Sequence, residues 1–160
     1  MTRRLPALAI LLGLLGLIPF FVCGFLALSP DPAQSERWSQ ALLAYGAVIL
    51  SFLGGVHWGF ALLDSELIVP RIERRRLVLG ILPSLAGWLA VLLPRLLAPW
   101  SGLLLLIAGF IATAIVEQKA AAAGLMPRAY MWLRWSLTVV VAAILITVFT
   151  LRFLGQSLNY

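Results

Sequence analysis

Five long apolar stretches occupy most of this 160-residue chain, and they constrain its fold more than any other feature. The hydrocarbon core of a bilayer is about 30 Å thick, so a helix that crosses it needs about 20 apolar residues. Only 11% of the residues are charged, against about 25% in ordinary soluble domains. The sequence therefore predicts an all-α integral membrane protein, a single domain over residues 1–160 that forms a bundle of five transmembrane helices. The predicted spans are residues 5–28, 41–63, 77–93, 99–116 and 135–153.

The basic residues gather in alternate gaps between these spans. Nine of the 12 fall on one side of the predicted bundle: Arg3, Arg4, Arg71, Arg74, Arg75, Arg76, Lys119, Arg128 and Arg134. The other three, Arg37, Arg95 and Arg152, fall on the opposite side. Lys and Arg in short loops stay in the cytoplasm. The N-terminus is therefore predicted to be cytoplasmic and the C-terminus outside, in a bacterial inner membrane.

Charge and aromatic residues agree with a bilayer as the partner. The basic residues lie beside spans, where they meet anionic headgroups, so nucleic acid is excluded as a partner. Trp132 and Trp135 begin the last predicted span, where indole rings favour the membrane interface. That span has no glycine before Gly155, and we expect it to be the most lipid-exposed.

The first apolar stretch has two interpretations. Its basic start and the later Ala27-Leu28-Ser29 are typical of a secretory signal, but its 24 apolar residues exceed the roughly 7–15 of a signal core. We therefore predict an uncleaved span, mildly kinked at Pro19. The segment 29–40, which contains Pro30 and Pro32, is predicted to be a loop. Cys23 is the single cysteine, so no disulfide framework is expected.

The second stretch is rich in glycine, unlike its Leu-rich neighbours. At about 100° per residue, Gly46 and Gly54 lie on or beside the helix face that carries His57, and Gly55 and Gly59 lie nearly opposite. Small residues let helices approach closely in lipid. These four glycines therefore predict a helix packed on both sides, at the centre of the bundle.

Polar and aromatic side chains fall at one predicted depth, in the cytoplasmic half of the membrane. Ionisable groups are costly there and are functional candidates. The residues predicted to line a ligand pocket at this depth are His57, Trp58, Ser84, Trp88, Thr113 and Glu117.

A purely structural role is the alternative for each of these residues. His57 could bond a neighbouring carbonyl, and the two tryptophans could serve in packing. Glu117 lies near the interface, where it could be solvated or paired with one of the arginines at 74–76. The sequence leaves both interpretations open.

Familiar catalytic chemistry is missing from the sequence. One histidine and one cysteine cannot form a closed zinc site or a bis-histidine haem site. There is no P-loop, G-x-S-x-G or C-x-x-C motif. We therefore predict no catalytic residues, no metal ligands and no enzyme, and no cofactor can be named.

Several short motifs resemble a known family. They are GLIPF at 16–20, YGA at 45–47, FLGGVHWG at 52–59 and PSL at 83–85, followed by Trp88. In these the chain is similar to the domain-of-unknown-function 3429 family, bacterial relatives of the mitochondrial transmembrane protein 69. The resemblance extends over about residues 12–150. It implies an inner-membrane protein of bacteria or mitochondria and supplies no catalytic residues.

These observations favour a protein that binds rather than reacts. The leading hypothesis is that the predicted pocket takes a small hydrophobic or amphipathic molecule, or a membrane-protein partner. One alternative is a channel or carrier for protons or a small solute. Another is an accessory or assembly subunit of a membrane complex.

Overall fold

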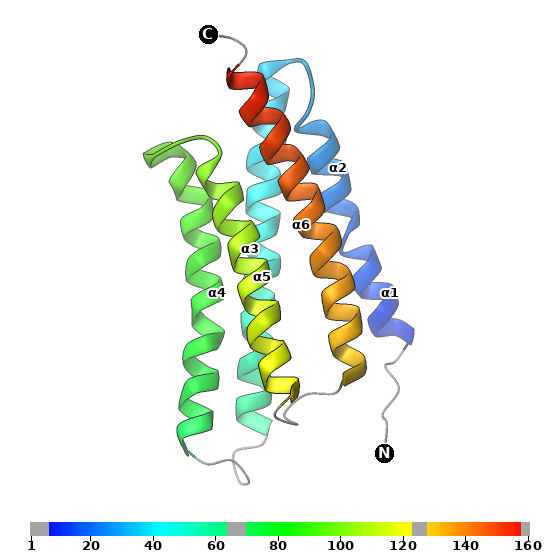
Figure 1. Ribbon diagram of the computed structural model, residues 1–160, viewed down its shortest axis with the longest axis vertical. Helices are drawn as coiled ribbons and strands as arrows, with labels where there is room; N and C mark the ends of the chain where they lie inside the picture. The colour runs from blue at the N-terminus through cyan, green and yellow to red at the C-terminus, as the bar shows by residue number, and fades with distance from the viewer. Residues whose placement is uncertain (1–6, 64–69, 123–127, 158–160) are drawn as a thin grey trace. The chain divides into compact units, whose positions relative to one another are not determined.

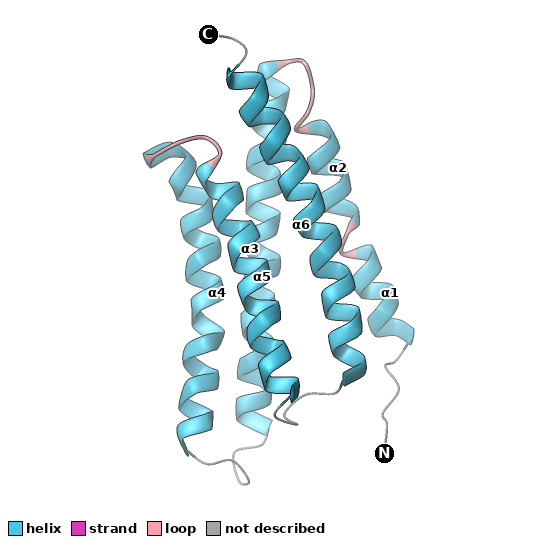
Figure 2. Cartoon of the chain, viewed as in Figure 1, coloured by secondary structure: helices cyan, strands magenta, loops and turns pink. Residues whose placement is uncertain are grey.

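The structure is a computed structural model that describes residues 7–63, 70–122 and 128–157, and all its regular elements there are helices (Figures 1 and 2). In chain order these are α1 (Ala7–Leu15), α2 (Ile18–Leu26), α3 (Pro32–Leu63), α4 (Pro70–Leu96), α5 (Ser101–Ala122) and α6 (Arg128–Ser157). Together, α1 and α2 are long and apolar enough to cross a bilayer, as is each of the other four helices. The predicted all-α protein with five spans is confirmed.

The first span is broken where the kink was predicted. Pro19 has no N–H group, so the carbonyl of Leu15 lacks its usual helical donor. Helix α1 ends at Leu15 and α2 begins at Ile18. Between them the Leu17 N–H donates to the Leu14 carbonyl at 3.0 Å, three residues back, which tightens the last turn. Proline at the second position of α2 is compatible with a helix start.

Helix α3 begins at Pro32, so the predicted loop over residues 29–40 is wrong for most of its length. Asp31 precedes the first helical residue, and its Oδ1 accepts the backbone N–H of Ala33 at 3.0 Å. Asp is a preferred N-cap, and proline fits the first helical position because its missing N–H would have no helical partner there. Asp31 and Pro32 therefore start a helix here.

Contacts divide the chain into two units, Met1–Leu42 with Phe110–Tyr160, and Leu43–Gly109. In the first unit α6 packs against α1 and α2 (Figure 1). A Cβ built on Gly24 would lie 2.7 Å from Ile144 Cγ2 of α6. The ring of Phe20 meets that of Phe110 edge-on, with centroids 5.9 Å apart.

Helix α6 is not the most lipid-exposed span, contrary to the sequence prediction. The most apolar part of its span is 28% buried, against 22% for Ala7–Leu26 and for Leu77–Leu96. Its buried positions follow a helical repeat, in which each has another three or four residues away: Met131, Arg134, Thr138, Val141, Ala142, Leu145 and Val148. This spacing follows one face of a helix, and that face gives α6 its contacts within the first unit.

Glycines set the helix contacts of the second unit. A Cβ built on Gly54 of α3 would fall on the carbonyl oxygen of Gly80 in α4, and one on Gly87 would lie 3.0 Å from the Cα of Ala47. A Cβ on Gly46 would lie 2.6 Å from Leu106 Cδ1 of α5. In lipid such close approach supplies the van der Waals contact that holds helices together.

The two neighbouring glycines of α3 offer a matched test of this packing. Alanine favours a helix over glycine by up to about 1 kcal/mol. For Gly55→Ala, where no described atom lies within 4 Å of the new Cβ, we expect unchanged or slightly higher stability. For Gly54→Ala we expect a loss of about 1–3 kcal/mol, because a backbone carbonyl cannot yield. Unfolding free energies in mixed micelles measure both, and equal values would contradict this packing.

Candidate functional site

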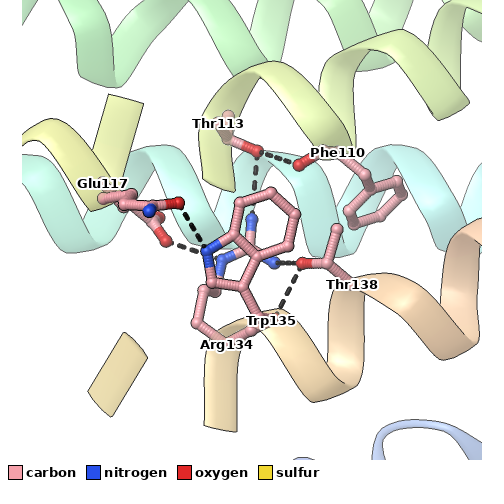
Figure 3. A network of polar contacts seen from close by, with 7 residues as sticks. Phe110, Thr113, Glu117, Arg134, Trp135 and Thr138 are labelled. Atoms are coloured by element: carbon pink, nitrogen blue, oxygen red, sulfur yellow. Dashed lines mark hydrogen bonds and ion pairs between the residues drawn. The ribbon is translucent and has the colours of Figure 1, made fainter. Parts of the chain in front are cut away.

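Helices α5 and α6 are joined by a buried ion pair in the first unit. Arg134 Nε lies 2.6 Å from Glu117 Oε2, and the two side chains are 5% and 0% exposed (Figure 3). A charge buried away from water costs several kcal/mol unless it is paired and hydrogen-bonded. The two side chains therefore form a buried, hydrogen-bonded ion pair between α5 and α6.

Two threonines complete the surroundings of the guanidinium group. Arg134 Nη2 donates to Thr113 Oγ1 at 3.0 Å, and Nη1 donates to Thr138 Oγ1. The two hydroxyls in turn donate to backbone carbonyls, Thr113 to Phe110 at 3.0 Å and Thr138 to Arg134 at 2.8 Å. Each guanidinium nitrogen thus has an oxygen partner, as a buried charge requires.

Helical spacing places these four side chains together. Thr113 precedes Glu117 by four residues on α5, and Thr138 follows Arg134 by four on α6. Residues four apart share a helix face. Each helix therefore presents one charge and one hydroxyl to the other.

An open recess lies on the same two helices. Its volume is about 340 Å³, and its lining includes Gln118 of α5 with Met131, Trp132 and Trp135 of α6. Trp135 Nε1 donates to Gln118 Oε1 at 3.0 Å across the helix contact. This volume is at the lower end of the range of about 300–1,000 Å³ for ligand pockets.

The other end of α6 carries a more exposed polar contact. Arg152 Nη2 lies 2.9 Å from Glu36 Oε2, with side chains 20% and 49% exposed. Arg152 Nη1 also donates to Ser39 Oγ on α3. Exposed pairs contribute about 0–1 kcal/mol, so this contact serves as a reference for the buried pair.

The predicted pocket residues fall into both units. Thr113 and Glu117 meet within the Arg134 cluster of the first unit, and Glu117 is paired with Arg134, a partner that the sequence analysis did not name. The arginines at 74–76 were predicted as possible partners of Glu117. Their side chains are not among those that the structure describes.

The remaining four predicted residues belong to the second unit. His57 is buried, whereas Trp88 is 60% exposed and Ser84 is half-buried. Trp58 Nε1 donates to the Leu77 carbonyl at 3.0 Å, which links α3 to α4. The pocket predicted from all six residues stays a prediction.

The four predicted packing glycines also differ in their surroundings. Gly46 and Gly54 lie at the close approaches of the second unit. Gly55 and Gly59 are exposed, with no described atom within 4 Å of a Cβ built on either.

The role of Arg134 and the recess beside it do not follow from the predicted spans. Arg134 was assigned to the basic gap before the last span, but it lies inside the span Tyr130–Leu154 and is 4% exposed. One signal was available: Arg134 and Thr138 repeat the four-residue spacing of Thr113 and Glu117. Within the described residues, no three His, Cys, Asp or Glu side chains come together as metal ligands.

Comparison with known proteins assigns this sequence to a family. The family described as "Protein of unknown function (DUF3429)" matches residues 5–150. The chain belongs to the DUF3429 family. Together with its five apolar helices, this makes it a multi-pass membrane protein.

About half of this DUF3429 chain is similar to two curated relatives. Transmembrane protein 69 of Xenopus tropicalis is 42% identical over 87 residues, which cover 54% of this chain and 33% of the relative. Transmembrane protein 69 of Mus musculus is 35% identical over 88 residues, with coverages of 54% and 34%. The match thus spans about a third of each relative's length. No solved structure matches the chain.

The ion pair makes a direct prediction about stability. Arg134→Met leaves the Glu117 carboxylate buried without a cation, and we expect a loss of about 3–5 kcal/mol in unfolding free energy. Arg152→Met removes an arginine from the exposed pair, with an expected loss below about 1 kcal/mol. Unfolding in mixed micelles followed by circular dichroism compares the two. Equal losses would show that burial adds nothing to the contact.

Proposed function

We propose that this DUF3429 protein binds a small amphipathic molecule in the recess between α5 and α6 and catalyses no reaction. The observation that carries the proposal is the lining of the recess, in which two tryptophans and a methionine supply apolar surface and Gln118 supplies an amide. Binding sites combine such apolar walls with a few placed polar groups.

The neighbouring ion pair supports a binding role by fixing the walls. Glu117 and Arg134 directly precede Gln118 and Trp135 in the sequence, so a bond that holds the pair also holds the recess residues. All three guanidinium nitrogens of Arg134 are bonded to oxygen atoms. The cluster is therefore suited to holding the recess residues in place. A proton or solute pathway and an accessory-subunit role stay predictions.

The distribution of basic residues supports a location for the recess. With the buried Arg134 left out, eight of the 12 basic residues lie on the side of the chain that includes the gap between α5 and α6, which favours the cytoplasmic face of a bacterial inner membrane. Gln118 is four residues from the end of α5, and Trp132 is four from the start of α6. At about 1.5 Å per residue, both lie roughly 6 Å from the helix ends, near the headgroups.

Single-cysteine labelling tests this orientation. Two variants are made in a Cys23→Ala background, and each has one exposed thiol. Arg37→Cys places the thiol on the predicted outer side of the membrane, and Lys119→Cys places it on the predicted cytoplasmic side. We expect a membrane-impermeant maleimide added to intact cells to label the Arg37 variant only. Labelling of the Lys119 variant in intact cells would reverse the orientation.

A ligand screen tests the binding site. Purified protein is heated with single-chain lipids, quinones and porphyrins, and a ligand at about 100 times its Kd should stabilise by about 2.7 kcal/mol. We expect at least one class to raise the Tm of the unchanged protein. Trp132→Ala should abolish the shift, and Phe52→Ala, at an exposed aromatic residue of α3, should retain it. A shift that survives Trp132→Ala, or no shift with any class, would contradict the proposed site.

A further inference from the structure

The orientation of the Gln118 amide carries information about the ligand. An indole N–H only donates hydrogen bonds, so the Gln118 atom 3.0 Å from Trp135 Nε1 is the amide oxygen, Oε1. The amide nitrogen, Nε2, therefore points away from Trp135. Among the described residues it donates to no protein acceptor. Gln118 lines the recess, and its bond to Trp135 uses the amide oxygen and leaves the amide donor for a ligand.

The rest of the lining is apolar and suits a flat group. Met131 is 8% exposed and Trp132 is 82% exposed, so one lies deep and the other at the rim. Indole faces stack on planar groups, and a thioether adapts to their edges. The recess has a volume of about 340 Å³ and is open on one side. That room accommodates one headgroup.

The available donor selects the polar end of the ligand. An amide N–H₂ group bonds carbonyl, ester or phosphate oxygens and offers nothing to a cation. An uncharged or anionic oxygen acceptor therefore fits the recess best.

We propose that the recess binds the carbonyl-bearing headgroup of a membrane amphiphile, whose carbonyl oxygen accepts from Gln118 Nε2 while its apolar part lies on Trp132 and Met131. A quinone with a long apolar tail and the ester group of a phospholipid share this chemistry. The inference rests on the proposed binding function and adds the ligand class and the residue that selects it.

Gln118→Glu tests the donor with little change of shape. The carboxylate keeps an oxygen to accept from Trp135 Nε1 but replaces the amide donor with a second acceptor. Gln118→Met removes both polar atoms at similar size. Gln34→Glu on an exposed turn of α3 controls for the added charge.

Affinity is measured by quenching of tryptophan fluorescence in the detergent-solubilised full chain. One arm titrates a decyl-substituted benzoquinone, and the other titrates phosphatidylglycerol. We expect at least one of them to bind, with a Kd at least tenfold higher for both Gln118 variants and unchanged for Gln34→Glu. The arm that responds identifies the source of the carbonyl group.

The outcomes separate this inference from the proposed function. Binding that is lost in Trp132→Ala but unchanged in both Gln118 variants would overturn the donor role and leave the recess as the site. Binding of neither probe would overturn the ligand class, and the Tm screen would then decide the proposed function alone. A Kd raised equally by Gln34→Glu would overturn the assignment to Gln118.

Discussion

The bond between Glu117 and Arg134 is the interaction on which the first unit depends. Lipid provides no hydrophobic force between helices, because its chains are as apolar as leucine, so packing and polar contacts must hold them together. A lone arginine or glutamate at this position would cost several kcal/mol. The cost is offset because Glu117, Thr113 and Thr138 give oxygen partners to all three guanidinium nitrogens. One polar cluster therefore fixes the register of α5 on α6, and that register forms the recess beside it.

The second unit reaches close packing by another route. Its helices approach where side chains are absent, with Gly54 of α3 against Gly80 of α4 and Gly87 against Ala47. Gly102 of α5 lies so close to the Ala90 carbonyl that a Cβ there would fall on the oxygen. That carbonyl has lost its helical donor, since Pro94, four residues later, has no N–H group. Such contacts depend only on the shape of the helix surfaces. The polar cluster of the first unit depends in addition on which side chains can form hydrogen bonds with each other.

The sequence predicted the number of spans well and the partners of its polar residues poorly. Hydropathy is a property of each segment, so five apolar stretches were enough to predict five spans. The start of α3 was misplaced because Asp31 and Pro32 are frequent in turns, although they also cap helices. Glu117 and Thr113 were identified from their depth. Arg134, Trp132 and Trp135 were assigned to the interface. The contacts of Arg134 and Trp135 with α5 depend on which helices are neighbours, and periodicity within one helix does not encode that.

The most direct test of this account is a double-mutant cycle on the buried pair. Glu117→Gln, Arg134→Met and the double variant are unfolded in mixed micelles beside the unchanged protein. If each buried charge is stabilised by the other, removing the second charge after the first should lower the unfolding free energy far less than removing it alone. The account predicts a coupling energy of at least about 1.5 kcal/mol, within the range of about 0.5–3 kcal/mol for residues in contact. Losses that add within about 0.5 kcal/mol would show that the two side chains act independently and would contradict the central role of the pair.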